Sequence, residues 1–273
     1  MKKTGIIGLG KMGYSLLTGF MNSGALKEEQ VWIFDLKKEN MDKANSHWPK
    51  INTGESVEEI VGDADLLFIV VEPKDVFNVL MQIKDLLKPE THVISLAACI
   101  TIDNISNVIP SMITKVIPAV LFKHQAGVTL MSHSSRVTSQ AERFIEKLFK
   151  RVCTLRVIKE QDFEAVANYT SVGPALIASL SEEIVATGLK YSDISREETE
   201  ELLLLTIKGT IKMLQQEGLS FANMVDMVAT KGGITEAGVK VLDKKFPPIM
   251  EEFFNITLKK HEDIKAELGK KFE

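Results

Sequence analysis

The sequence predicts an α/β protein in which a doubly wound sheet forms the N-terminal part and helices alone form the C-terminal part. Short apolar runs typical of buried strands alternate with helical patterns up to residue 157, and a glycine-rich turn follows the first run. No strong strand pattern appears after residue 160. We therefore expect two domains, residues 1–160 and residues 161–273.

The first predicted strand leads directly into the glycine-rich turn. Lys3 to Ile7 are followed by Gly8-Leu9-Gly10-Lys11-Met12-Gly13, a Gly-x-Gly-x-x-Gly pattern. In a dinucleotide-binding turn the first glycine allows the tight turn, the second lets backbone N–H groups approach a pyrophosphate, and the third lets the next helix pack closely. That helix, expected over Tyr14 to Met21, points its N-terminus at the phosphates. All six turn residues are therefore predicted to bind a dinucleotide.

A second buried strand, Val31 to Phe34, ends at Asp35, which follows Gly13 by 22 residues. An acid at about this distance can accept the ribose hydroxyls of NAD and repel the extra phosphate of NADP. Asp35 therefore favours NADH. The alternative interpretation is an exposed turn residue beside Lys37 and Lys38.

Further strands are predicted within residues 65–71, 92–96, 115–118, 128–131 and 152–157. The run Asp65 to Val71 is typical of a strand buried on both faces, as in a parallel sheet. Glu72 and Pro73 follow at its carboxyl end, where open α/β sheets bind ligands, and Pro73 suits the first turn of a helix. We expect Val71, Glu72 and Pro73 to contribute to the dinucleotide site.

Composition limits the classes of partner. The chain is 45% hydrophobic, and 33 basic residues are interspersed with 37 acidic ones for a net charge of −4. There is no basic stripe for nucleic acid, no polybasic segment for a membrane, and no run near the roughly 18 apolar residues of a membrane span. The first residues form a strand rather than a signal peptide, so we expect a cytoplasmic protein. Cys99 and Cys153 lack metal-ligand spacing and are expected in the core, with no metal bound.

The C-terminal part is expected to be helical. A long helix is predicted over Ala165 to Thr187, interrupted at Gly173-Pro174, and capping boxes at Ser56–Glu59 and Ser195–Glu198 predict two further helix starts. The second of these helices is apolar almost all round at Leu202 to Leu205. Such a helix is either the hub of a bundle or part of a dimer interface.

Thr230-Lys231-Gly232-Gly233-Ile234-Thr235 follows another predicted helix. A glycine pair flanked by two hydroxyls can bind an anion through exposed N–H groups. The alternative is a helix–turn–helix connection that uses glycine to reach positive φ.

Taken in order along essentially all 273 residues, these segments resemble the pyrroline-5-carboxylate reductase family. The matching patches are the Gly8-Gly10-Gly13 turn, Val71-Glu72-Pro73, Lys115-Val116-Ile117-Pro118 with Gly127, Gly173-Pro174-Ala175, and Lys231 to Thr235. The resemblance implies a Rossmann domain, a helical domain that forms a homodimer or higher oligomer, and reduction of the cyclic imine 1-pyrroline-5-carboxylate to L-proline with NADPH or NADH. It also implies that the substrate carboxylate binds to a loop whose residues here are Thr230, Lys231, Gly232, Gly233 and Thr235, with the hydroxyls of Thr230 and Thr235 as the catalytic groups.

The chain departs from the family pattern at three places. Ala119 replaces an Asn that lies beside the nicotinamide in the family, Val172 replaces a Ser, and Lys231 replaces a Pro. This pattern resembles the divergent branch that includes the late-competence ComER proteins of bacilli. Two alternatives therefore stand beside proline synthesis: a regulatory, non-catalytic dinucleotide-binding paralogue, and a reductase of another small imino or keto acid.

Hydride transfer to a protonated imine requires little beyond placement of the two reactants. No His or Lys stands out as a general acid. Lys123 and His124 follow Pro118 and either face the pocket or lie in an exposed loop, and the Lys231 ammonium either pairs with the substrate carboxylate or points to solvent.

Overall fold

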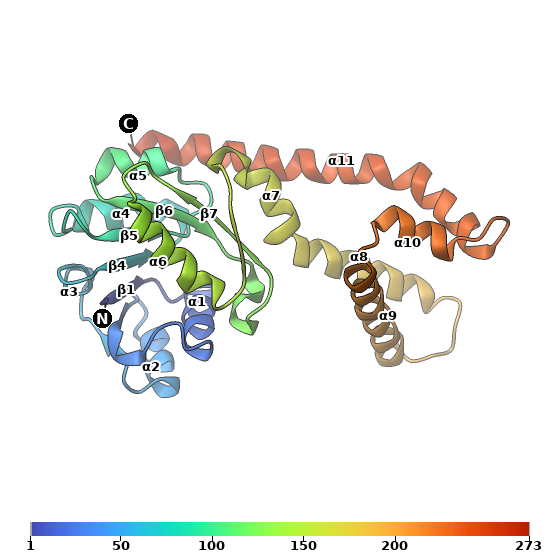
Figure 1. Ribbon diagram of the computed structural model, residues 1–273, viewed down its shortest axis with the longest axis horizontal. Helices are drawn as coiled ribbons and strands as arrows, with labels where there is room; N and C mark the ends of the chain where they lie inside the picture. Colours follow the sequence, from blue (N-terminus) through green and yellow to red (C-terminus); the bar gives the residue numbers. More distant parts are fainter. Residues whose placement is uncertain (1, 273) are drawn as a thin grey trace. The chain divides into compact units, whose positions relative to one another are not determined.

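The computed structural model describes residues 2–272, which form two compact units (Figure 1). The first unit combines the chain up to Gly173 with the residues from Thr257 onward, and the second unit is Pro174–Ile256. The predicted boundary at residues 160 and 161 does not coincide with this division. Helix α7 (Phe163–Thr170) packs on the sheet through Phe163 and Ala167. Near the chain's end, Phe272 is buried in a hydrophobic cluster of the first unit.

The first unit contains a sheet with the strand order β3-β2-β1-β4-β5-β6-β7-β8. Every neighbouring pair is parallel except β6 and β7, which are antiparallel. The strands are β1 Thr4–Ile7, β2 Val31–Phe34, β3 Asn52–Thr53, β4 Leu66–Ile69, β5 His92–Ser95, β6 Met112–Ile117, β7 Val128–His133 and β8 Thr154–Val157. The predicted doubly wound α/β sheet is confirmed.

Helices cover both faces of this sheet. One face packs against α1 (Lys11–Asn22), α2 (Lys38–His47) and α6 (Ser139–Lys150), and the other against α3 (Val57–Val61), α4 (Pro73–Ile83) and α5 (Ile102–Val108). Central strands such as β4 are fully buried, which explains their continuous apolar sequence. Pro73 is the first residue of α4, as predicted.

Three features of the sheet differ from the predictions. Strand β3 was not expected, because its two residues are polar, one of them partly buried and the other exposed. Strand β6 begins at Met112, three residues before the predicted Lys115. The antiparallel β6–β7 pair is joined through the short 3-10 helix η2 (Val120–His124), since antiparallel strands need no long crossover.

The two capping boxes have different outcomes. Both helices start after the predicted serine, and the Ser195 hydroxyl accepts the N–H of Glu198 at 3.2 Å. Ser56 makes no such cap, and instead the N–H of Glu55 donates to Glu59 Oε2 at 2.8 Å.

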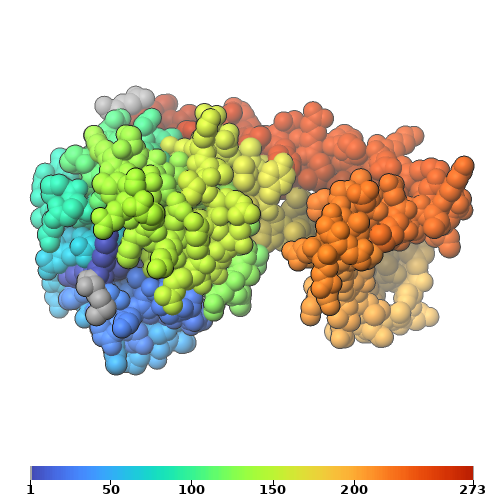
Figure 2. Space-filling model, in the orientation of Figure 1, coloured from blue at the N-terminus to red at the C-terminus, as the bar shows by residue number. Residues whose placement is uncertain are grey.

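The second unit is helical throughout, with no strand among its residues, all of which the structure describes. It contains α9 (Arg196–Glu217), α10 (Phe221–Val228), most of α8 (Gly173–Gly188) and the larger part of α11 (Ile234–Gly269), seen in gold to red-orange in Figure 2. Val185 is the only buried hydrophobic residue of Pro174–Ile256. No residue of α9 is buried, so within one chain this helix is not the hub of a bundle.

Among residues 2–272, no helix combines the length and the apolar character that a membrane span requires.

Candidate functional site

The glycine-rich turn joins β1 to α1, and two of its glycines are required by the fold. Gly8 has φ +95°, and a Cβ added to it would lie 2.5 Å from the carbonyl oxygen of Val70 in the segment after β4. A Cβ on Gly13 would lie 2.0 Å from the carbonyl oxygen of Gly8. Side chains at these positions would collide with backbone, so the close approach of β1, β4 and α1 depends on both glycines.

Gly10 is different. Apart from its own chain neighbours, no described residue has a heavy atom within 4 Å of a Cβ built on it, and it borders a cavity of about 520 Å³. The fold itself therefore has no need of a glycine at position 10. A glycine there keeps space open beside the N-terminus of α1, where a phosphate can accept backbone N–H groups.

The cavity lies at the carboxyl ends of β1, β2 and β4 and along α4. Of the predicted dinucleotide residues, Gly8, Gly10, Asp35, Val71 and Glu72 line it. Leu9, Lys11, Met12, Gly13 and Pro73 are adjacent along the chain but are not among the lining residues. The structure thus brings the glycine turn, the acid after β2 and the segment after β4 to one site.

Asp35 is held by the backbone around it. Its Oδ2 accepts the N–H of Leu9 at 2.6 Å and its Oδ1 accepts the N–H of Lys37 at 2.8 Å. The carboxylate therefore braces the glycine turn from the end of β2. Because a carboxylate has about four acceptor positions, each oxygen can accept a further hydrogen bond from a ribose hydroxyl.

The same cavity also contains basic and amide groups. Lys37, Asn40 and Lys74 line it, and Lys74 pairs with Glu72 at 2.7 Å. The hydrogen bond from Lys74 lowers the pKa of Glu72. Positive charge is therefore available near Asp35.

The loop between α10 and α11 contains the predicted substrate residues. Gly232 has φ +77°, and its N–H donates to Glu236 Oε2 at 2.8 Å. The N–H of Gly233 donates to the carbonyl oxygen of Thr230 at 2.9 Å. Both glycine N–H groups are therefore engaged within the loop, which differs from the expectation that they are exposed to an anion.

Other donors of this loop remain available. The N–H groups of Ile234 and Thr235 belong to the first turn of α11, where no intrahelical acceptor exists. Lys231 and the hydroxyl-bearing Thr230 and Thr235 are exposed in the single chain. The loop can thus offer helix N–H groups, two hydroxyls and one ammonium to an anion.

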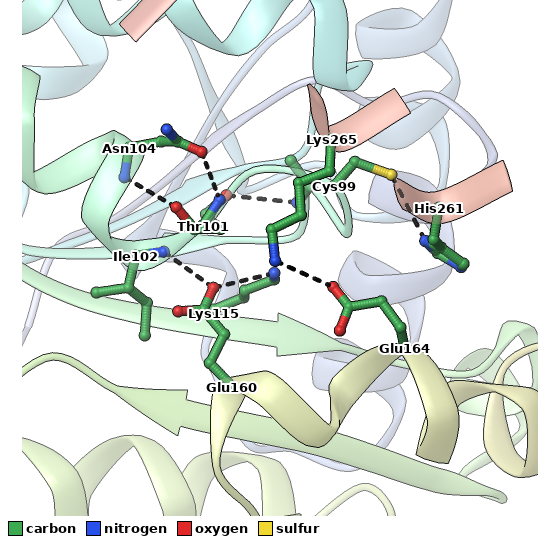
Figure 3. A network of polar contacts seen from close by, with 11 residues as sticks. Cys99, Thr101, Ile102, Asn104, Lys115, Glu160, Glu164, His261 and Lys265 are labelled. Atoms are coloured by element: carbon green, nitrogen blue, oxygen red, sulfur yellow. Dashed lines mark hydrogen bonds and ion pairs between the residues drawn. The ribbon is translucent and has the colours of Figure 1, made fainter. Parts of the chain in front are cut away.

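A buried polar network that the sequence analysis missed lies near the carboxyl end of β5 (Figure 3). Lys115 of β6 has an exposed fraction of 0% and its Nζ lies 3.1 Å from Glu160 Oε1, which also accepts the N–H of Ile102 at 2.9 Å. Glu160 follows Lys115 by 45 residues, so the pairing has no local sequence signal. The only indication is a lysine in an apolar run.

The same network reaches the C-terminal end of α11. Cys99 Sγ lies 3.6 Å from His261 Nδ1, and Lys265 Nζ lies 4.0 Å from Glu164 Oε1 (Figure 3). Burial raises the pKa of the Cys99 thiol. Cys99 is buried as predicted and Cys153 is partly buried, and both are free thiols. These contacts hold the end of α11 against the rest of the first unit.

Two remaining features involve none of the residues that line the dinucleotide cavity. Lys123 and His124 are exposed at the end of η2. A second, more polar cavity of about 370 Å³ is lined by Ser132, Arg136 and Glu160 among others, and no predicted site residue lines it.

Comparison with known proteins gives two domain matches. Residues 160–264 match the family described as pyrroline-5-carboxylate reductase dimerisation, and residues 3–99 match the family described as NADP oxidoreductase, coenzyme F420-dependent.

Whole-length relatives agree with these matches. The chain is 29% identical over 271 residues to pyrroline-5-carboxylate reductase 3 of Bacillus subtilis, covering 99% of both chains. It is 24% identical over 265 residues to ComE operon protein 4 of the same organism, covering 97% of both. The crystal structure of Plasmodium falciparum pyrroline carboxylate reductase with NADP bound superposes with a TM-score of 0.83 at 24% identity, covering 100% of this chain and 98% of that one. The fold is therefore shared across the full length.

Proposed function

We propose that the chain is a member of the pyrroline-5-carboxylate reductase family and that it reduces 1-pyrroline-5-carboxylate to L-proline with NADPH or NADH. The observation that carries the proposal is the presence, on one chain, of an open glycine-rich turn beside a cavity and of the reductase family's dimerisation region. Membership of an oxidoreductase family accounts for the dinucleotide site. Beyond that membership, we propose 1-pyrroline-5-carboxylate as the imine substrate.

The cavity fits a nicotinamide dinucleotide. Gly10 leaves the space that a pyrophosphate needs, the N-terminus of α1 offers N–H groups, and Asp35 has free acceptor positions for a ribose. When bound, the reduced nicotinamide supplies the hydride. The task of the protein is then to hold the imine carbon near it and to exclude other reactions.

We assign the substrate carboxylate to the loop between α10 and α11. The hydroxyls of Thr230 and Thr235, the first N–H groups of α11 and the Lys231 ammonium are the groups that would hold it. Gly232 and Gly233 contribute the shape of the turn, since their own N–H groups are engaged.

For the cofactor, we propose that both forms bind and that NADH is preferred. Asp35 disfavours an added 2′-phosphate, whereas Lys37 and Asn40 of the same cavity offer it partners. Asp35→Ser should shift the ratio of NADH to NADPH affinity towards NADPH by about tenfold, the equivalent of one unfavourable charge contact. An unchanged ratio, measured by fluorescence titration, would make Asp35 a turn residue only.

We further propose that the active form is a homodimer or higher oligomer assembled through the helical unit. Residues 174–256 bury one hydrophobic side chain, while Leu204 and Leu205 of α9 are 65% and 58% exposed. Helices with this much unburied apolar surface need a partner. The cytoplasmic location remains a prediction from the sequence.

The proposal is tested in cells by complementation. Expression of the chain in a bacterial strain that lacks its own pyrroline-5-carboxylate reductase should restore growth without proline. Absence of rescue by a soluble, NADH-binding protein would contradict it. The Gly10→Val variant serves as the matched negative control.

A regulatory, non-catalytic dinucleotide-binding protein is the second candidate. It is favoured by the 24% identity to ComE operon protein 4 over 97% of both chains, together with Ala119, Val172 and Lys231 in place of the family's usual residues. Normal NADH binding without turnover would support it. Turnover with a different imino or keto acid would instead identify another reductase.

A further inference from the structure

The loop proposed to bind the substrate carboxylate already holds a carboxylate of the chain itself. Glu236, in the first turn of α11, accepts the N–H of Gly232 through Oε2 at 2.8 Å, and its Oε1 lies 3.0 Å from Lys240 Nζ. The hydrogen bond from Gly232, followed by that from Lys240, lowers the pKa of Glu236. The side chain is therefore charged and has a partner on each oxygen.

This contact fixes the most unusual backbone conformation of the loop. Gly232 has φ +77°, a region that glycine enters freely but does not prefer over others. A hydrogen bond to its N–H from a side chain rooted in α11 ties the turn to the helix. The loop is closed on its other side by the Gly233 N–H bond to Thr230, whose Oγ1 would lie 2.7 Å from a Cβ on Gly233.

The contact also keeps Glu236 away from the end of its own helix. An acid in a first helical turn is attracted to the free N–H groups there. Here its oxygens face the Gly232 N–H and the Lys240 ammonium instead, so the N–H groups of Ile234 and Thr235 are left for another acceptor. Lys240 offsets the negative charge that Glu236 would otherwise present to an incoming anion.

We propose that Glu236 is a positioning residue for the substrate: it sets the Gly232 turn so that the first N–H groups of α11 and the Thr235 hydroxyl converge on the substrate carboxylate. The inference rests on the proposed function, because it takes this loop as the carboxylate site. It adds a residue that never touches the substrate.

Two substitutions in the full-length protein separate this role from a charge effect. Glu236→Gln keeps a carbonyl oxygen that can accept the Gly232 N–H, whereas Glu236→Ala removes the acceptor. With saturating NADH, Glu236→Ala should raise the KM for pyrroline-5-carboxylate about tenfold, with kcat within about twofold of wild type. Glu236→Gln should stay within about threefold in KM. The Kd for NADH should not change in either, and Glu251→Ala, an exposed acid on the same helix, serves as the matched control.

Calorimetric titration of pyrroline-5-carboxylate into the protein with NADP⁺ bound gives the same comparison without turnover. Two outcomes would overturn the positioning role while the proposed function stands. In the first, Glu236→Ala has the wild-type KM and Kd; in the second, Glu236→Ala and Glu236→Gln weaken binding equally. Binding without turnover in the wild type would remove the proposed function, and the Kd series would still decide the role of Glu236. A wild type that neither binds nor reduces the imine would overturn both.

Discussion

Gly8, Gly10 and Gly13 belong to one motif, but they have different physical roles. Substituting Gly8 or Gly13 would drive a Cβ into backbone, whereas Gly10 faces open space. The sequence motif identified all three positions together with Asp35, because their spacing is local. The motif also predicted these separate roles, and the surroundings of the three glycines agree with them. It could not identify the atom that excludes a side chain at Gly8, because that atom is the carbonyl oxygen of Val70, about sixty residues away along the chain.

This difference gives a direct prediction. Gly10→Val should lower the affinity for NADH and NADPH at least tenfold, because its side chain would fill the pyrophosphate space, while the melting temperature changes little. Gly13→Ala, the matched control, should destabilise the protein strongly through its contact with the Gly8 carbonyl. Fluorescence titration and thermal melting measure the two effects. Unchanged nucleotide binding by Gly10→Val would refute the site.

One buried histidine, His92, and one partly buried histidine, His133, were not singled out by the sequence analysis. The Thr114 hydroxyl lies 2.6 Å from His92 Nε2 and 2.8 Å from His133 Nδ1, on one face of strands β5, β6 and β7. Burial, with a smaller contribution from the nearby His133, lowers the pKa of His92 to about 3, and burial lowers that of His133 as well. Both rings are therefore neutral in the folded protein near pH 7.

The consequence is a loss of stability in acid. An unfolded histidine binds a proton below about pH 6.5, whereas folded His92 does not until about pH 3, so the unfolded state gains protons as the pH falls. Between these values His92 should contribute a decrease of about 1.4 kcal/mol in the free energy of unfolding per pH unit. His92→Gln should reduce the slope of unfolding free energy against pH by about that amount, as measured by urea titrations from pH 6.5 to 4.5. Parallel slopes would contradict the assignment.

At the scale of secondary structure, the apolar runs predicted the central strands well, because full burial leaves a continuous apolar sequence. The two-residue β3 and the antiparallel direction of the predicted β7 could not be predicted in the same way, since pairing and strand direction are set by distant partners. The sequence predicted a glycine-containing segment directly after a helix, and the structure has this segment as the loop between α10 and α11. Its hydrogen bonds were not predictable, because the partner of Gly232 depends on how the Glu236 side chain turns back.

The loop yields a test of the proposed substrate contact. Thr235→Val should remove one hydrogen bond to a charged group, worth roughly 1.5–3 kcal/mol, and raise the KM for pyrroline-5-carboxylate about tenfold or more. NADH binding should be unaffected. Lys231→Ala should raise the KM further only when the Lys231 ammonium contacts the anion. That increase in KM should become smaller as the salt concentration rises. A Thr235→Val enzyme with wild-type KM would exclude this hydroxyl from the site.

At the scale of the whole molecule, the sequence left two interpretations of the apolar α9 helix. The interpretation as the hub of a bundle is wrong for the single chain, because none of its residues is buried there. The match of residues 160–264 to a dimerisation family agrees with the interface interpretation. A sequence pattern alone cannot separate the two, since burial inside one chain and burial between chains require the same apolar side chains.

The interface is open to a solution test. The wild type should sediment as a dimer or larger assembly, and Leu204→Glu should shift it towards monomer by placing a charge in an apolar contact. Glu201→Lys, at an exposed charged position of the same helix, is the control and should leave the assembly intact. Analytical ultracentrifugation over a range of concentrations reads out both. A Leu204→Glu protein as tightly associated as wild type would place the interface elsewhere.

Hydride transfer from the bound dinucleotide to pyrroline-5-carboxylate can be followed with an isotope label on the hydride itself. The purified full-length protein is mixed with pyrroline-5-carboxylate and NADH carrying deuterium at the transferable position of the nicotinamide, and the product is analysed by mass spectrometry. The expected product is L-proline with one deuterium on the former imine carbon, formed as NADH absorbance falls. Unchanged imine at every pH, in a protein that binds NADH normally, would contradict it.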